Sequence, residues 1–424
     1  MYFSVTMQGT ANQIGLRKCG PLGNTHILVD FLGEGGFGLV TKCISTVTGT
    51  EVAIKVNKNR PHIFDQARRE IAILKRLRDL DPDTCNIVKW NGFFFHRENI
   101  CLNFELLDKS LHDYRVRRRN QNLSMRELRP VIHQLATALS HLSSKQIVHA
   151  DLKPENVMVV DSRQHPIRVK LIDFGLAHPR FGIDPGACVQ TTWYRAPEVI
   201  LQLPFDEAID MWSLGLTIVE MATGCPMYPG DTEYDVLRYI VETQGQPPDH
   251  MLDSGMATKY YFATQNNGER RWRLKTPWEI RAETGMPSMD GRYCVLKCLD
   301  DLEQQIVSDT EDPSEKRLLL DLIKRMLELD PVQRIKPLEV LQHPFLTQSL
   351  KAGMQTQDCE VSIVCQAGAE NIHHGLVLSP TDESASSSDK ENGSQPETNA
   401  ENQSWLRRLV GRISDTLSYY FCCG

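Results

Sequence analysis

Short stretches of apolar and β-branched residues, separated by glycines and polar turns, occupy the first quarter of the chain. Residues 39–44 alternate apolar and polar side chains, the pattern of a half-buried strand. A turn at 48–50 separates them from the next such stretch. The strands predicted in this part of the chain are 26–32, 39–44, 51–56, 87–95 and 100–104.

Two longer stretches follow a helical period instead. Apolar side chains at positions 67, 71, 74 and 77 predict an amphipathic helix over residues 64–80. The same periodicity predicts a helix over residues 128–142. Between them, a further helix is expected to carry the basic residues Arg115 and Arg117–Arg119. We interpret these arginines as a solvated face, with a nuclear import signal as the alternative.

The composition changes at both ends of the chain. Residues 1–25 are rich in glycine and have no pattern, so we expect a loose lead-in. Residues 379–404 are rich in Ser, Asp, Glu, Asn and Gln, which cannot bury a core, so we expect 347–403 to be a disordered polar tail. The first residues lack the charged leader and apolar core of a signal peptide. No run of about 18 apolar residues predicts a membrane span.

Residues 404–424 predict a C-terminal amphipathic helix. Its apolar face is led by Trp405 and its opposite face carries arginines such as Arg408, which suits a helix lying at a membrane surface. Cys422 and Cys423 would allow S-acylation as a second anchor, whereas Phe421 stands where a prenylation signal needs cysteine. The alternative is a helix that packs on its own domain or on a partner, with incidental cysteines.

Overall composition narrows the function only slightly. The 424 residues allow two or three domains, and the net charge of −7 argues against a chain that binds nucleic acid over its whole surface. The 12 cysteines include no C-x-x-C pair, which indicates free thiols in a reducing compartment. We therefore expect a cytoplasmic or nuclear protein, with a membrane-associated pool if the C-terminal helix binds lipid.

The densest group of chemically active residues lies between positions 147 and 156. Asp151, Lys153 and Asn156 follow an apolar pair within a polar, proline-containing stretch that reads as a loop. Phosphoryl transfer needs such a set: a carboxylate for the proton of the attacking hydroxyl, a cation beside the developing charge, and an amide to hold a metal ion.

A glycine-rich turn precedes the second predicted strand. The pattern G-x-G-x-x-G is weak evidence alone, because dinucleotide sites and plain hairpins also use it. A dinucleotide site needs a helix directly after the glycines, whereas a strand follows here, which favours a phosphate-covering hairpin. The residues predicted to contact nucleotide in this turn and strand are Gly33, Glu34, Gly35, Gly36, Phe37, Gly38 and Val40.

Three more stretches complete a predicted nucleotide site. Lys55 lies inside an apolar strand with Ala53 and would hold the phosphates, fixed by Glu70 of the following helix. Asp173 ends a short strand and, with Asn156, would supply oxygen ligands to Mg²⁺. The adenine would lie against a stretch that contains Phe104, Glu105 and Leu107, in a strand where the pattern gives no reason for the polar Asn103.

In their order and spacing these motifs resemble those of the eukaryotic protein kinases, over roughly residues 26–346. A closer likeness to the homeodomain-interacting protein kinases, within the dual-specificity Tyr-regulated group, rests on residues 147–151, 203–210, 228–235, 243–247 and 272–277. The resemblance implies an α+β bilobal fold, with a β-rich lobe at about 26–107 and a mostly helical lobe at about 108–346. It also implies ATP and Mg²⁺ as cofactors and protein substrates with Ser or Thr acceptors.

The resemblance also assigns structural roles. Thr191 is expected to hydrogen-bond near Asp151 and Lys153, and Asp210 to cap the backbone of the loop before Asp151. Glu198 is expected to pair with Arg334. The likeness extends to relatives that are much longer, so their partner biology does not carry over.

The chain departs from its relatives in the activation segment. Relatives carry a tyrosine that becomes phosphorylated and an arginine that binds the phosphate. In this chain Cys188 stands at the tyrosine position and Thr192 at the arginine position. No Ser, Thr or Tyr lies between Asp173 and Val189. Because a phosphate needs arginine partners to order a loop, we expect a kinase that is active without activation-segment phosphorylation. The missing arginine also weakens the inference that proline follows the target residue.

We therefore predict a protein Ser/Thr kinase. The alternative from another class is a pseudokinase that binds or scaffolds. Such proteins usually lack at least one catalytic or metal-binding residue, whereas this chain keeps all five: Lys55, Glu70, Asp151, Asn156 and Asp173. In a third interpretation, membrane binding by the C-terminal helix is the main function, and the helix carries the kinase domain to the membrane.

Overall fold

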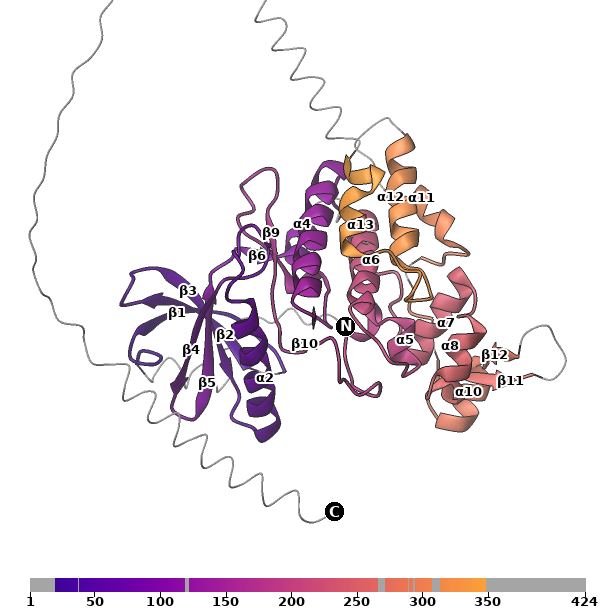
Figure 1. Cartoon of the computed structure of the whole chain (residues 1–424), viewed down its shortest axis with the longest axis horizontal. Helices are drawn as coiled ribbons and strands as arrows, with labels where there is room; N and C mark the ends of the chain where they lie inside the picture. The colour runs from indigo at the N-terminus through magenta and orange to yellow at the C-terminus, as the bar shows by residue number, and fades with distance from the viewer. Residues whose placement is uncertain are drawn as a thin grey trace, which may run out of the picture. The chain divides into compact units, whose positions relative to one another are not determined.

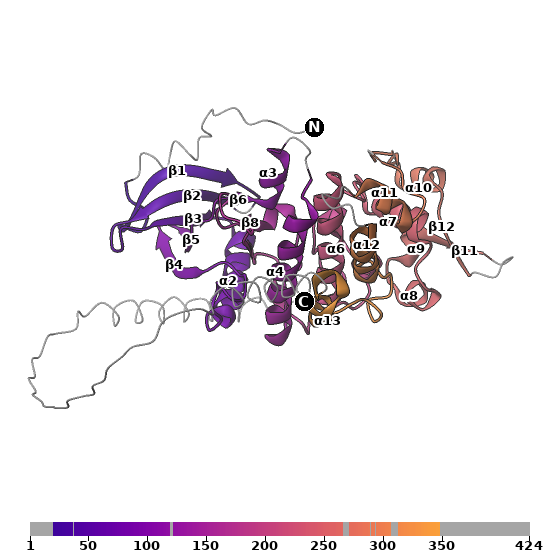
Figure 2. The ribbon, with the colours of Figure 1, turned by 90° about the horizontal axis from the view of Figure 1, so that it is seen from above.

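The computed structural model describes residues 20–347, except 37, 119–121, 266–270, 289, 293 and 307–312. Phe37, Arg119, most of the lead-in and the expected tail and C-terminal helix therefore lie outside the described residues. Figures 1 and 2 show a β-rich N-terminal lobe beside a mostly helical C-terminal lobe, which confirms the α+β bilobal fold expected from the resemblance.

The N-terminal lobe is a five-stranded antiparallel sheet with one long helix. All five strands were predicted, but the fourth begins three residues late, because Ile87 forms a bridge with Leu171 instead. In sheet order the strands are β1 (His26–Glu34), β2 (Gly38–Ser45), β3 (Glu51–Asn57), β5 (Asn99–Glu105) and β4 (Trp90–His96). The helix α2 runs over Pro61–Leu77 and turns Ile71 and Leu74 inward.

Asn103 is explained by a polar cluster at the sheet. Its amide oxygen accepts a hydrogen bond from Asn91 at 3.2 Å, and its amide nitrogen lies 3.1 Å from Nε2 of His26 on β1. Polar groups inside a sheet are tolerated when they are hydrogen-bonded. The side chains that satisfy Asn103 come from two other strands, which the alternation within one strand cannot reveal.

The C-terminal lobe is built around α6, on which every residue from Ile209 to Ala222 is buried. A helix with no solvent-facing side belongs inside a core. Its neighbours α4 and α12 pack against it. The helices of this lobe are α3 (Leu111–Val116), α4 (Met125–Ser144), α5 (Pro197–Ile200), α6 (Ala208–Thr223), α7 (Glu233–Gln244), α8 (Asp249–Ser254), α9 (Thr258–Tyr261), α10 (Pro277–Thr284), α11 (Leu302–Gln305), α12 (Pro313–Met326) and α13 (Pro337–Gln342).

Short strands and 3₁₀ turns connect these helices and carry the candidate site. The strands are β6 (Lys109–Ser110), β7 (Ile147–Val148), β8 (Val157–Val159), β9 (Val169–Leu171), β10 (His178–Pro179), β11 (Phe262–Thr264) and β12 (Trp272–Leu274). The turns are η1 (Pro154–Asn156), η2 (Thr192–Tyr194) and η3 (Leu299–Asp301). Among the described residues, no helix has the length and apolar character needed to cross a membrane.

The expectation of a solvated arginine face was wrong for Arg115. Its side chain is buried, forms an ion pair with Glu220 at 3.1 Å and donates to the carbonyl of Gly224 at 2.6 Å. Arg117 is exposed, as expected. A buried arginine survives only with such partners, and both partners come from the region around the end of α6, more than 100 positions away.

Candidate active site

A buried carboxylate shapes the loop that follows β7. Asp210, in the first turn of α6, accepts hydrogen bonds from the backbone N–H of His149 at 2.7 Å and of Ala150 at 2.8 Å. Ala150 has a positive φ of 63°, which costs energy for a residue with a side chain. The two bonds to Asp210 offset that strain and fix the direction in which the next residue, Asp151, leaves the loop.

The His149 ring joins this loop to the strand that carries Asp173. Its Nδ1 accepts from the Asp151 N–H at 3.2 Å, so Nε2 carries the proton and donates to the Ile172 carbonyl at 2.9 Å. The ring also packs edge-on against Phe174. The two predicted acidic site residues are therefore tied together through one imidazole.

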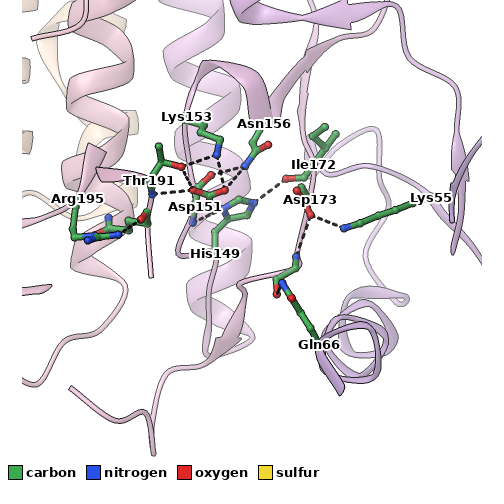
Figure 3. A network of polar contacts seen from close by, with 12 residues as sticks. Lys55, Gln66, His149, Asp151, Lys153, Asn156, Ile172, Asp173, Thr191 and Arg195 are labelled. Carbon is green, nitrogen blue, oxygen red and sulfur yellow. Dashed lines mark hydrogen bonds and ion pairs between the residues drawn. The ribbon is translucent and has the colours of Figure 1, made fainter. Parts of the chain in front are cut away.

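Asp151 is the centre of a compact polar network (Figure 3). One carboxylate oxygen accepts from the Thr191 hydroxyl at 2.7 Å, and the other accepts from Lys153 Nζ and Asn156 Nδ2, each at 2.9 Å. Lys153 also donates to the Thr191 hydroxyl at 2.6 Å. Three predicted residues from two separate segments thus surround the carboxylate of the fourth, Asp151.

Lys55, Glu70 and Asp173 form a second, mostly buried group. Lys55 Nζ lies 3.0 Å from both carboxylate oxygens of Glu70 and 2.8 Å from Asp173. Burial disfavours the charged lysine, but the two carboxylates outweigh it and raise the pKa of Lys55 above its usual range. The lysine therefore stays charged and joins α2 of the N-terminal lobe to the segment after β9. Gln66 of α2 contacts the same segment by donating to the Gly175 carbonyl at 3.0 Å.

A pocket of about 440 Å³ lies between the sheet and this group. Of the predicted nucleotide contacts, the following residues line it: Gly33, Val40, Ala53, Lys55, Phe104, Glu105 and Leu107. Glu34, Gly35, Gly36 and Gly38 do not. The sequence prediction missed the apolar walls Leu32, Val88, Met158 and Ile172. Leu32 and Ile172 adjoin the predicted residues Gly33 and Asp173, whereas Val88 and Met158 carry no such signal.

The glycines of the turn differ in the space that a side chain would have. A Cβ on Gly38 would lie 2.1 Å from the Val56 carbonyl oxygen, so the close crossing of β2 and β3 excludes any side chain there. A Cβ on Gly33, Gly35 or Gly36 would meet open space. Only the latter three leave the backbone free for a ligand to approach; Gly38 serves the sheet.

The residues predicted to bind metal fit Mg²⁺ by their donor chemistry. Asn156 donates its amide nitrogen to Asp151, and Oδ1 of Asp173 accepts from Lys55 and the Gly175 N–H. The amide oxygen of Asn156 and Oδ2 of Asp173 have no hydrogen bond to another residue that the structure describes. Mg²⁺ takes oxygen ligands and keeps positions for water and phosphate, so two protein oxygens suffice. In the described part of the chain, no separate group of three metal-binding side chains is found.

Comparison with known proteins decides the family. The family model for the protein kinase domain matches residues 27–346. This chain belongs to the protein kinase family. It is 43% identical over 334 residues to homeodomain-interacting protein kinase 2 of Mesocricetus auratus, covering 77% of this chain and 29% of that protein. It is 37% identical over 348 residues to homeodomain-interacting protein kinase 4 of Homo sapiens, covering 78% and 56%. The chain therefore spans less than a third of the length of the first relative and about half of the length of the second.

The activation segment of this kinase is held by Gln190 and Arg195. Gln190 has a positive φ of 63°, donates to the Ile209 carbonyl and accepts from the Ala196 N–H at 2.9 Å. The buried Arg195 donates to the Val189 carbonyl at 2.9 Å and to the Gln190 carbonyl at 2.7 Å. Cys188 is exposed, with its sulfur 3.9 Å from Arg195, and Thr192 opens η2.

Proposed function

We propose that this chain is an ATP- and Mg²⁺-dependent protein Ser/Thr kinase. One observation carries the proposal: Asp151 is surrounded by Lys153, Asn156 and Thr191, while Lys55 is paired with Glu70 and Asp173 beside a pocket large enough for a nucleotide. Phosphoryl transfer is catalysed mainly by positioning and electrostatics, and both groups are already assembled here.

Each residue has a role that follows from its contacts. Asp151 would accept the proton of the acceptor hydroxyl, and Lys153, 2.9 Å away, would neutralise charge that develops beside it. Lys55 would bind the nucleotide phosphates. Asn156 and Asp173 would hold Mg²⁺, which neutralises phosphate charge when bound. Because Lys153 and Thr191 lie close to Asp151, a short Ser or Thr hydroxyl suits the site.

The backbone of Gln190 supports proline at the position after the acceptor residue. Its carbonyl, which would otherwise be available to a substrate N–H, is occupied by Arg195 at 2.7 Å. An N–H left without an acceptor costs about 1–3 kcal/mol when buried. Proline has no N–H and avoids this cost, so proline direction remains part of the proposal although Thr192 replaces the usual arginine.

Independence from activation-segment phosphorylation is also part of the proposal. The segment between Asp173 and Val189 holds no Ser, Thr or Tyr. Arg195 and Gln190 already fix the segment through the hydrogen bonds described above, without an added phosphate.

The decisive experiment is phosphate transfer from ATP·Mg²⁺ to a peptide library by the purified full chain, with Asp173→Asn alongside. We expect transfer by the wild type and a loss of about 100- to 1,000-fold or more in the variant, as when one catalytic electrostatic contact is removed. Chelation of Mg²⁺ should have the same effect. Nucleotide binding without transfer by the wild type would instead support a scaffold.

A further inference from the structure

Arg195 is the residue through which the end of the activation segment is positioned. Its Nε and one terminal nitrogen donate to the carbonyls of Val189 and Gln190, so the direction of both carbonyls depends on this guanidinium. Arg195 is 8% exposed. A buried guanidinium needs a counter-charge to remain in place.

The counter-charge comes from outside the activation segment. The remaining terminal nitrogen of Arg195 donates to Oε1 of Glu233, the first residue of α7. Oε2 of Glu233 accepts from the Tyr261 hydroxyl at 2.6 Å. Glu233 therefore has one oxygen on the activation segment and the other on α9.

Tyr261 is itself fixed by the adjoining hairpin. Its carbonyl accepts from the Lys275 N–H at 2.9 Å, and the next residue, Phe262, is buried in β11. Burial and then the Glu233 carboxylate raise the pKa of Tyr261 above its usual range, so the hydroxyl keeps its proton and donates. The neighbouring Tyr260 is 70% exposed and does not take part in these contacts.

We propose that Glu233 and Tyr261 are positioning residues that set the preference of this kinase for proline after the acceptor residue. They hold Arg195 on the Gln190 carbonyl and so keep that carbonyl away from a substrate N–H. The inference rests on the proposed kinase function and extends it to substrate selection.

The test compares Glu233→Gln and Tyr261→Phe with the wild type in the full chain. Tyr260→Phe is the matched control, because it makes the same chemical change, loss of a phenolic hydroxyl, at the adjacent residue. Two peptides are used that differ only in proline or alanine after the acceptor serine. A second measurement, hydrogen exchange of residues 188–195, reports on the segment without any need for catalysis.

We expect the ratio of kcat/KM for the proline peptide to that for the alanine peptide to fall about tenfold in both variants, the effect of one charge-assisted hydrogen bond. Exchange in residues 188–195 should become faster in both variants. The KM for ATP should stay constant, because neither residue lines the nucleotide pocket. Tyr260→Phe should behave as the wild type throughout.

The possible failures are distinct. An unchanged peptide ratio in both variants, with an active wild type that prefers proline, would overturn the inference and leave the kinase function standing. An active wild type without preference for proline would overturn the specificity role directly. Transfer to neither peptide would overturn the kinase proposal and the specificity role with it.

Discussion

Thr191 and Asp151 are joined by two hydrogen bonds to one carboxylate oxygen, from the Thr191 N–H at 3.1 Å and from its hydroxyl at 2.7 Å. The hydroxyl also accepts from Lys153. Thr191 thus fixes the orientation of Asp151 and the position of the lysine, although it lies 40 residues further along the chain.

Replacing Thr191 by valine should lower kcat about 100-fold, because the carboxylate and the lysine lose the hydroxyl that orients both. Thr191→Ser keeps the hydroxyl and should retain most of the activity. Steady-state kinetics with one peptide substrate measures both variants. A valine variant as active as the serine variant would show that the backbone N–H alone positions Asp151.

The ion pair between Glu198 and Arg334 should be a large contribution to stability. Its distances are 2.6 and 3.0 Å, and both side chains are almost fully buried. Glu198→Gln or Arg334→Met should each lower the free energy of unfolding by about 3–5 kcal/mol, because each leaves its partner without a counter-charge. Urea unfolding of the double variant should show a loss smaller than the sum of the two single losses. A loss in the double variant equal to the sum of the two single losses would contradict energetic coupling between Glu198 and Arg334.

Removing the hydroxyl of Thr192 should leave activity unchanged. This position takes the place of the arginine that relatives use to receive a phosphate, and the structure holds the segment through Gln190 and Arg195 instead. Thr192→Ala is compared with the wild type by peptide phosphorylation, and mass spectrometry maps phosphate on both proteins. Loss of activity together with loss of a mapped phosphate at Thr192 would refute phosphate independence.

The C-terminal cysteines provide a test of membrane attachment. We expect the Cys422→Ser/Cys423→Ser double variant to shift from the membrane fraction to the soluble fraction of cells, because a single amphipathic helix anchors a protein only weakly. Deletion of residues 404–424 is the reference for complete release. An identical distribution of the double variant and the wild type would argue that the segment contacts protein instead.

The amino-acid sequence by itself determined the local elements and the inventory of the site. Strands β2 and β3 and helix α4 follow from side-chain periodicity, because each element exposes one face and buries another over neighbouring positions. The residues from Asp151 to Asn156 lie within six positions, so their proximity needed no tertiary structure. The resemblance that these motifs carry supplied the bilobal arrangement.

Only the tertiary structure decided which charged residues are buried and what they contact. Lys170 looks like one more strand lysine, yet it is 2% exposed and lies 2.7 Å from Glu105 and 2.9 Å from Asp83. Arg115 was expected in solvent and is buried beside Glu220. A charged side chain has the same local pattern whether water or a distant carboxylate balances it, so periodicity cannot distinguish the two cases.

The same limit applies to the activation segment. The resemblance implies that Cys188 and Thr192 stand where relatives carry a phosphorylated tyrosine and the arginine that binds its phosphate, but it does not show what holds the segment instead. Glu233 meets Arg195 across 38 positions because α7 packs beside η2, and Tyr261 of α9 meets Glu233 across a further 28 positions. Such contacts depend on how helices pack, and that packing is decided by the whole core rather than by any one segment.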